Sequence, residues 1–294
     1  MQTTERPGVI AACAAVVMWG AGNVVVKYIP MSGLSVAFNR LWLGAVFFTA
    51  LFMASGGRIT WRALKVATPG GIAFGLDVAV FFSAIKHTSV ADASVIGALQ
   101  PALVFLAAGR LFGERIRPST LVWTVIAIGA VIGSVLASSS AAGRTATGDL
   151  LSIGAVIAWS AYFVLSKRAR QQLGAMEYQA CMTIVGAIVL TPIALIGAHD
   201  LVIHTASNLG WMAIMVAVPG GGHLLMNWAH AHVPIVLTSL LTLAIPVVAT
   251  LGALIFLGEG TTAVQLGCIA VVVLALVVVV RSGAPADLAA PTAA

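Results

Sequence analysis

Charged side chains are scarce in this chain. They make up 8% of its 294 residues, whereas hydrophobic residues make up 60%. A soluble globular protein has roughly a quarter charged residues, so this chain cannot cover a water-facing surface with polar groups. The shortage of charge excludes a soluble domain and predicts an integral membrane protein.

Clusters that hold metals, disulfides or catalytic groups are also lacking. Cys13, Cys181 and Cys268 lie far apart in apolar segments and without C-x-x-C spacing, which indicates neither a metal site nor a disulfide framework. An intramembrane hydrolase would need a nucleophile beside a base, or a metal cluster, and neither a His-x-x-His nor a Gly-x-Ser-x-Gly motif occurs. We therefore expect no catalytic residue, no metal and no cofactor.

Long apolar runs are abundant instead. Each is about 20 residues long, the length that a helix needs to cross roughly 30 Å of hydrocarbon, and longer than the ten-residue segments of a membrane barrel. The runs lie near 8–28, 34–54, 66–86, 89–111, 119–138, 148–169, 175–197, 209–231, 235–257 and 262–281. The sequence predicts an all-α membrane protein with ten transmembrane helices.

Positive residues are distributed unevenly between the ends of these runs. Ten spans place both termini on one side, where most Lys and Arg residues also fall, against only Lys27, Lys86 and Arg144 on the other side. The positive-inside rule therefore predicts cytoplasmic termini. Orientation explains the net charge of +6 without nucleic-acid binding, which would need a basic patch on a soluble face.

The two halves of the chain repeat each other. Four residues recur at an offset of 145, since His87, Pro101, Gly113 and Glu114 match His232, Pro246, Gly258 and Glu259; Trp19 and Lys27 match Trp159 and Lys167 at an offset of 140. The expected units are a five-helix repeat over 1–138, a linker over 139–147, a second repeat over 148–281 and a disordered tail over 282–294.

The second repeat must cross the membrane in the opposite sense, because five is an odd number of helices. Loop charges agree: the loop after span two contains Arg58, Arg62 and Lys65, whereas its counterpart after span seven has no Lys or Arg. Inverted repeats surround a central cavity with a binding site near the bilayer midplane. The pattern predicts a transporter that works by alternating access.

Two matching segments resemble a known family. The stretch "AIKHTSVADASVIGALQPALVFLAAGRLFGERI" (84–116) and its echo "AHAHVPIVLTSLLTLAIPVVATLGALIFLGEG" (229–260) are similar to the repeated signature of EamA-type members of the drug/metabolite transporter superfamily. The chain most resembles the ten-helix YddG-like exporters. That resemblance implies export of aromatic and other neutral amino acids, or related metabolites, across a bacterial inner membrane.

Aromatic residues at mid-depth suggest where a substrate binds. Trp19 and Asn23 share one helical face, and Trp159 and Phe163 repeat that spacing at equivalent positions. A Trp that only anchors a helix prefers the headgroup region, so this pair suggests an aromatic-lined cavity; the alternative is simple helix packing. The expected substrate-binding residues are Trp19, Asn23, Asp77, Phe81, Gln100, Trp159, Tyr162, Phe163, His223 and Asn227.

Polar groups at membrane depth are costly and therefore suggest function. One hypothesis is that Asp77 and His223 occupy equivalent depths and pair as a titratable site; the alternative is that each is satisfied separately. Arg40 could attract a carboxylate, although snorkelling toward the external surface is the commoner behaviour. Glu114 is interpreted as a helix-stabilising carboxylate.

Helix-breaking residues suggest moving parts. Pro101 and Pro246 lie at equivalent positions in spans four and nine, and Gly97 precedes the first of them, so we expect these three residues to act as hinges. The run "PGGG" at 219–222 either unwinds the eighth span to bind substrate or allows close helix packing. Gly129 and Gly133 form a G-x-x-x-G pattern that suits a contact inside a monomer or in a homodimer.

Three other functions remain as alternatives. A proton-coupled exporter of organic cations would need a carboxylate in the first span, so Asp77 would have to serve. A carrier of sugar phosphates or nucleotide-sugars would need several cations converging at mid-depth, and Arg40 is the one candidate. A membrane enzyme or structural subunit lacks any supporting motif. The expected partners are a small-molecule substrate and membrane lipid.

Overall fold

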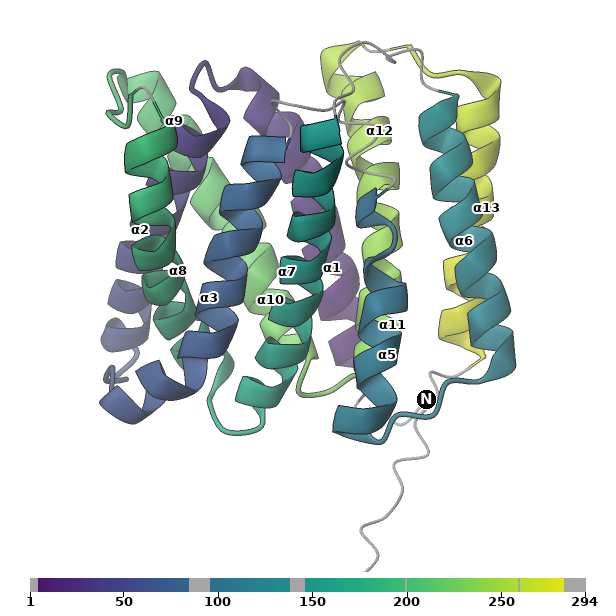
Figure 1. Cartoon of the computed structure of the whole chain (residues 1–294), viewed down its shortest axis with the longest axis horizontal. Helices are drawn as coiled ribbons and strands as arrows, with labels where there is room; N and C mark the ends of the chain where they lie inside the picture. Colours follow the sequence, from purple (N-terminus) through teal and green to yellow (C-terminus); the bar gives the residue numbers. More distant parts are fainter. Residues whose placement is uncertain (1–4, 85–95, 138–145, 199, 259, 283–294) are drawn as a thin grey trace, which may run out of the picture.

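The computed structural model describes residues 5–84, 96–137, 146–198, 200–258 and 260–282, and every regular element in these ranges is helical. The α-helices are α1 (Glu5–Val25), α2 (Gly33–Ala54), α3 (Trp61–Ala84), α5 (Gln100–Phe112), α6 (Pro118–Leu136), α7 (Ala146–Arg170), α8 (Ala175–Gly197), α9 (Ala206–Met215), α10 (Gly221–Ala229), α11 (Ile235–Leu241), α12 (Ile245–Leu257) and α13 (Ala263–Arg281) (Figure 1).

Three of the membrane spans in the described residues consist of more than one helical segment, the first of them of α1 and the 3₁₀ helix Val26–Tyr28. A π-helical turn (Val216–Gly220) joins α9 to α10, and a 3₁₀ turn (Thr242–Ala244) joins α11 to α12. Nine segments of the described residues are long and apolar enough to cross a membrane, and α5 is a shorter apolar helix. The predicted ten-helix all-α fold is confirmed, although the beginning of span 89–111 lies outside the described residues.

The two repeats run in opposite directions through the bundle. The first helix begins and the last helix ends at the bottom of Figure 1, which we call the terminal face; the other side is the opposite face. Whereas α1 leads away from the terminal face, its counterpart α7 leads toward it. The fold therefore consists of two inverted five-helix repeats, as the loop charges predict.

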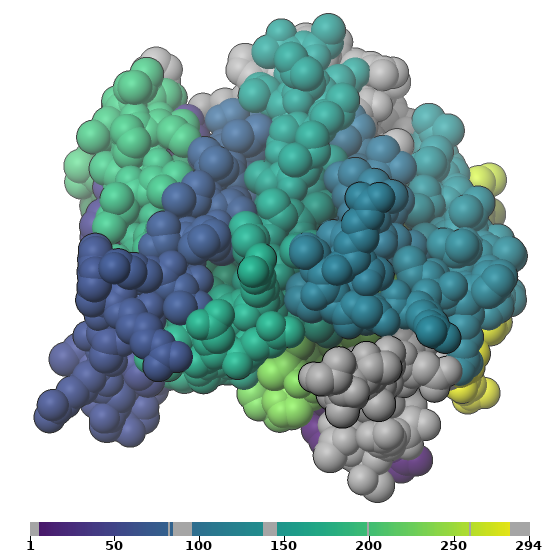
Figure 2. Space-filling model, turned by 60° about the horizontal axis from the view of Figure 1, so that its bottom comes forward, coloured from purple at the N-terminus to yellow at the C-terminus, as the bar shows by residue number. Residues whose placement is uncertain are grey.

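The repeats are interleaved in space. Helix α1 packs against α10 and α12 of the second repeat, and in the same way α7 packs against α3 and α5 of the first. Figure 2 shows this arrangement at the surface, where the teal-green residues of α7 lie between the blue residues of α3 and the teal-blue residues of α5. Each repeat thus supplies its first helix to the core of the other.

Glycine allows two of these helices to approach closely. A Cβ atom on Gly75 of α3 would lie 2.7 Å from the carbonyl oxygen of Gly186 on α8, and one on Gly71 would lie 2.6 Å from Cβ of Val185. Membrane helices gain packing contacts when small residues let their backbones meet. This contact holds α3 of the first repeat against α8 of the second.

Helix ends explain why a Gly-Glu pair occurs twice. Gly113 ends α5 with φ 66° and Gly258 ends α12 with φ 65°. A left-handed residue after a helix favours glycine because it has no Cβ to clash with the backbone. Pro101 and Pro246 lie in the first turns of the same two helices, where the missing proline N–H is tolerated.

Helices α6 and α13 form a pair at one edge of the bundle (Figure 1). Their outer surfaces expose large apolar side chains such as Val125 and Leu274, as expected of residues that face lipid. A Cβ on Gly133 would lie 3.2 Å from Sγ of Cys268 on α13, whereas a Cβ on Gly129 would have no atom within 4 Å. The G-x-x-x-G pattern thus provides one contact inside the monomer.

Candidate substrate-binding site

Six rings from both repeats meet in the middle of the bundle. We call Trp19, Phe74, Trp159, Tyr162, Phe163 and His223 the aromatic cluster; they come from α1, α3, α7 and α10. The ring of Trp19 lies 6.3 Å from that of Trp159 and 4.8 Å from that of His223, while Phe74 lies 4.7 Å from His223. The structure therefore joins Trp19, Trp159 and Phe163, as the repeat symmetry suggests.

The run at residues 219–222 is helical rather than unwound, because Pro219 and Gly220 end the π-helical turn and Gly221 begins α10. The carbonyl oxygen of Pro219 accepts a hydrogen bond from Nε1 of Trp19 at 3.2 Å. A Cβ on Gly222 would lie 3.0 Å from the same Nε1 and 3.1 Å from the carbonyl oxygen of Ala15. The glycines thus allow close packing of α10 against α1, and Trp19 satisfies the carbonyl that the turn frees.

A chain of hydrogen bonds continues from the aromatic cluster into α8. Oη of Tyr162 donates to Oδ1 of Asn227 at 3.2 Å, and Nδ2 of Asn227 donates to Oε1 of Gln179 at 2.8 Å. Nδ1 of His223 lies 3.1 Å from the same Tyr162 oxygen. Because the single tyrosine proton is used toward Asn227, Nδ1 of His223 is the donor in this arrangement.

Gln179 is a participant that sequence reasoning missed. It is 1% exposed and lies about one turn into the apolar span of α8. The rule that polar groups at membrane depth suggest function could have identified it. Its partner Asn227 lies on another helix, so the sequence does not show that the two meet.

Asp77 interacts with Arg40 rather than with His223. The span of α3 and the span of α9 and α10 run in opposite directions, so Asp77 lies nearer the opposite face and His223 nearer the terminal face. The predicted pairing at equal depth is therefore wrong, because inversion places equivalent positions at mirrored depths. The opposite charge that acts on the Asp77 carboxylate is the guanidinium of Arg40.

Arg40 points into the bundle and does not snorkel outward. It lines a small cavity together with Gln179 and His223, and its guanidinium interacts electrostatically with the carboxylate of Asp77. An arginine near the end of a span can reach the surface, but here the interior offers both a carboxylate and free space. The expected external orientation of Arg40 is therefore wrong.

The other predicted residues lie apart from the aromatic cluster. Asn23 is exposed on α1, one turn beyond Trp19, and Phe81 is half-buried one turn beyond Asp77. Gln100 is fully buried, and its Oε1 accepts a hydrogen bond from Oγ1 of Thr242 at 3.4 Å. Gln100 thus connects the start of α5 to the 3₁₀ turn that precedes α12.

Both prolines follow an interruption of their helix. Ala98 and Leu99 form a turn just before α5, and the 3₁₀ turn lies just before α12. Gly97 precedes the first interruption and would have room for a Cβ atom. The 3₁₀ turn divides span nine just before Pro246, whereas movement about Gly97, Pro101 and Pro246 stays a prediction.

Glu114 joins the repeats at the terminal face. Its carboxylate accepts hydrogen bonds from the backbone N–H groups of Ile235 at 2.7 Å and Val236 at 3.0 Å, and it pairs with Nζ of Lys167 at 2.9 Å. Glu114 therefore stabilises a helix terminus, as predicted, but that of α11 in the other repeat rather than that of α6. Glu259 lies outside the described residues.

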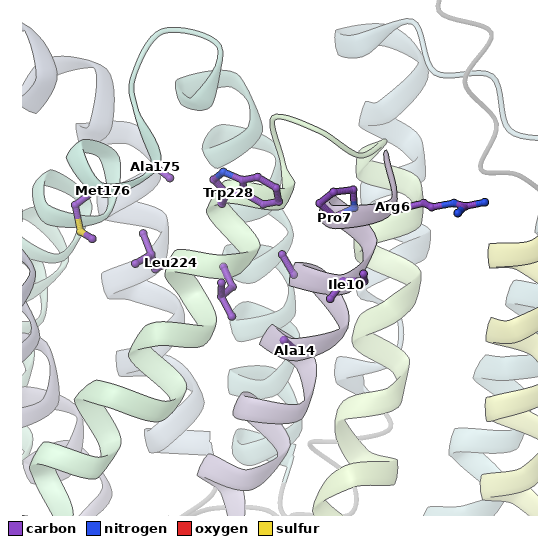
Figure 3. Close-up of a pocket in the computed structure, with 10 residues that line it drawn as sticks. Arg6, Pro7, Ile10, Ala14, Ala175, Met176, Leu224 and Trp228 are labelled. Atoms are coloured by element: carbon purple, nitrogen blue, oxygen red, sulfur yellow. The ribbon is translucent and has the colours of Figure 1, made fainter. Parts of the chain in front are cut away.

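A larger cavity of about 780 Å³ opens between α1, α8 and α10 toward the terminal face (Figure 3). Apart from Arg6, the residues that line it are apolar: Pro7, Ile10, Ala11, Ala14, Ala175, Met176, Leu224, Leu225 and Trp228. The close contact of Gly222 with Ala15 and Trp19 closes the space between α1 and α10 beyond it. Among the described residues, no group of three His, Cys, Asp or Glu could hold a metal ion.

Comparison with known proteins agrees with this architecture. A 27% identical uncharacterized transporter of Archaeoglobus fulgidus matches over 89% of this chain and 92% of its own length. The threonine/homoserine exporter RhtA of Escherichia coli K12 is 24% identical over 88% of this chain and 86% of its own length. The pseudopaline exporter CntI of Pseudomonas aeruginosa is 25% identical, and the match covers 45% of this chain and only 46% of CntI.

A crystal structure superposes with a TM-score of 0.77 at 18% identity, over 94% of this chain and 96% of that chain, which shows a shared fold. The EamA-like transporter family matches twice, at residues 6–136 and 146–281. Members of this family are multi-pass membrane transporters and not enzymes. The chain, with its two inverted repeats around a shared aromatic and polar core, belongs to the EamA-like transporter family.

Proposed function

We propose that this protein exports neutral amino acids, or small metabolites derived from them, by alternating access. The observation that carries the proposal is the site built by both repeats in the membrane core, where the aromatic cluster adjoins Arg40, Asp77 and Gln179. Rings suit an apolar side chain, whereas charged and amide groups suit a zwitterionic head. Relative movement of the repeats would expose this site to each side in turn.

The relatives support the substrate class in general terms. RhtA is named as an exporter of threonine and homoserine, and CntI as an exporter of pseudopaline. The rings of Trp19, Trp159 and Phe163 favour the further inclusion of aromatic amino acids.

We further propose that the protein lies in a bacterial inner membrane with both termini in the cytoplasm. The basic residues at the helix ends are concentrated at the terminal face, among them Arg62, Arg115 and Arg168. The positive-inside rule assigns such a face to the cytoplasm. Export then means movement from the terminal face to the opposite face.

The geometry favours this function over the alternatives. An exporter of organic cations would bind a cargo that carries positive charge alone, and Arg40, which acts electrostatically on Asp77, would repel such a cargo. A carrier of phosphorylated sugars needs several converging cations, and among the described residues Arg40 is the one Lys or Arg that lines the small cavity with Gln179 and His223.

Counterflow in proteoliposomes tests the proposed function. Vesicles that contain the purified full chain and unlabelled L-threonine or L-phenylalanine should accumulate the same labelled amino acid, whereas protein-free vesicles should not.

Replacing half-buried Trp159 with Ala should reduce this uptake by about tenfold, because a ring of the site is lost. Trp61→Ala is the matched control, since Trp61 is 71% exposed at the start of α3. Absence of counterflow for threonine, homoserine, phenylalanine and tryptophan would refute the proposal.

A further inference from the structure

A small cavity lies where five elements of the two repeats meet, namely α2, α3, α8, the π-helical turn and α10. It is about 10 Å³ in volume, which is room for about one water molecule. Its polar lining residues are Arg40, Gln179, Thr183 and His223, and its other lining residues are Leu41, Gly44, Phe48, Phe74, Val216 and Gly220. Because α2 and α3 belong to the first repeat and α8 and α10 to the second, movement between the repeats would change its size.

Gln179 contributes an amide group that is only half satisfied. Its Oε1 accepts the hydrogen bond from Asn227 at 2.8 Å, which fixes the orientation of the amide. Its Nε2 is buried and, within the part of the chain that the structure describes, has no acceptor. A buried donor without an acceptor is unfavourable and is rare in native proteins. The side chain is held in place with this donor available.

Arg40 contributes further donors without an acceptor. Among the described residues, its guanidinium makes no hydrogen bond, and no carboxylate oxygen lies within the 4.0 Å of an ion pair. Asp77 is the carboxylate with which it interacts, at a longer range. An arginine in the membrane core normally pairs with a carboxylate or with carbonyl groups. The guanidinium is therefore placed beside a cavity with its hydrogen-bonding capacity unused.

Thr183 and His223, the other polar residues of the lining, each make one or more hydrogen bonds elsewhere. Oγ1 of Thr183 donates to the carbonyl oxygen of Gln179 within its own helix at 2.8 Å. Nδ1 of His223 is bonded to Tyr162. Among the described residues, the lining donors without a partner belong to Arg40 and Gln179, while Nε2 of His223, which makes no hydrogen bond either, is an acceptor when Nδ1 is the donor. The chemical complement of such a pair is a negatively charged acceptor, and a carboxylate matches the fork of a guanidinium.

We propose that Arg40 and Gln179 bind the carboxylate group of the exported substrate, an inference that rests on the proposed exporter function. Asp77, whose carboxylate interacts with Arg40 across more than 4.0 Å, supplies the negative charge for the ammonium group of the same substrate. The site selects amino acids and excludes amines that lack a carboxylate. The cavity has room for about one water molecule, so it has to enlarge before it admits a carboxylate group. Movement of α2 and α3 relative to α8 and α10 enlarges it.

Counterflow of labelled L-phenylalanine and L-threonine, measured over a range of concentrations, tests this carboxylate site. Arg40→Gln should raise KM by about tenfold or more, because donors matched to a substrate group discriminate strongly, and Arg40→Lys should restore part of the loss. Gln179→Met, which keeps the side-chain length, should raise KM by a smaller factor. Arg58→Gln removes the same charge from an exposed loop position and should leave KM unchanged.

Competition against the unmodified protein gives a second readout that does not depend on the folding of a variant. Phenethylamine and phenylalanine methyl ester, which lack the carboxylate, should compete at least about tenfold more weakly than unlabelled phenylalanine. If the ester competes as well as the amino acid, or if folded Arg40→Gln retains the original KM, the carboxylate site is wrong while the exporter function stands. If the unmodified protein moves no amino acid, the exporter function itself is wrong.

Discussion

Glu114 is a buried carboxylate that connects three helices from both repeats. One oxygen bonds to the N–H of Ile235 and to Nζ of Lys167, and the other oxygen bonds to the N–H of Val236. Nζ of Lys167 also donates to the carbonyl oxygen of Val233 at 2.8 Å. These contacts satisfy the first N–H groups of α11, which have no partner within their own helix.

Replacing Glu114 with Ala should therefore destabilise the protein strongly. Removal of one member of a buried ion pair costs about 3–5 kcal/mol in soluble proteins, because it leaves an uncompensated buried charge. The double variant Glu114→Gln with Lys167→Met removes both charges together and should lose less. Thermal unfolding in detergent, followed by tryptophan fluorescence, would compare their Tm values. A Tm for Glu114→Ala equal to that of the unmodified protein would show that the contact does not hold the helices.

Helix α3 and helix α8 depend on glycine for their separation. A methyl group at Gly75 would lie 2.7 Å from the carbonyl oxygen and 3.0 Å from the Cα atom of Gly186. Both of these are backbone atoms and cannot rotate away. The two helices therefore have to separate before any side chain fits at this position.

Gly75→Ala should lower the Tm in detergent by several degrees, since overpacking a tight contact costs about 1–3 kcal/mol. Gly129→Ala on α6 is the matched control, because its Cβ would have no atom within 4 Å and its φ is ordinary for a helix. The control should be neutral or slightly stabilising, as alanine favours a helix over glycine. Equal Tm values for the two variants would contradict the close approach of α3 and α8.

The interrupted helices meet at the centre of the fold. Gln100 begins α5 just before Pro101, and it contacts Thr242 in the 3₁₀ turn that precedes α12. The 3₁₀ turn separates α11, which begins at the terminal face, from α12, which ends at the opposite face. This arrangement suits the proposed hinges. Because Gln100 contacts Thr242, a tilt of α5 would also move the start of α12 in the other repeat.

At the scale of the whole molecule, interleaving decides how the repeats can move. Since α1 packs against α10 and α12, and α7 against α3 and α5, neither repeat can rotate without moving the first helix of the other. The small cavity beside Arg40 lies on surfaces that belong to both repeats. A rocking motion of the two repeats would therefore open this cavity toward one face of the bundle and close it toward the other face.

The proposed orientation predicts which loops are accessible from outside a bacterial cell. Val202 is exposed in the loop between α8 and α9 at the opposite face, and Gln172 is exposed between α7 and α8 at the terminal face. In a chain without its native cysteines, Val202→Cys should react with a membrane-impermeant maleimide in intact cells. Gln172→Cys should react only after permeabilisation. The reverse pattern would place the termini outside.

The sequence predicts the helices far better than it predicts their contacts. Span lengths, the Gly-Glu helix ends and the inverted repeat depend on local chemistry and on composition, so each can be read directly from the residues. Trp19 and Trp159 could be joined because repeat symmetry relates them. Asp77 and His223 could not be placed correctly in this way, because inversion reverses depth along the second copy.

The sequence by itself determined a membrane protein of ten helices in two inverted repeats, because apolar length, loop charge and internal matches are properties of the chain alone. The tertiary structure decided that Arg40 turns inward beside Gln179 and that Glu114 caps a helix 121 positions further along. These contacts depend on how each helix is rotated about its axis and which neighbour it packs against. Hydropathy leaves that rotation open, and only packing between the two repeats fixes it.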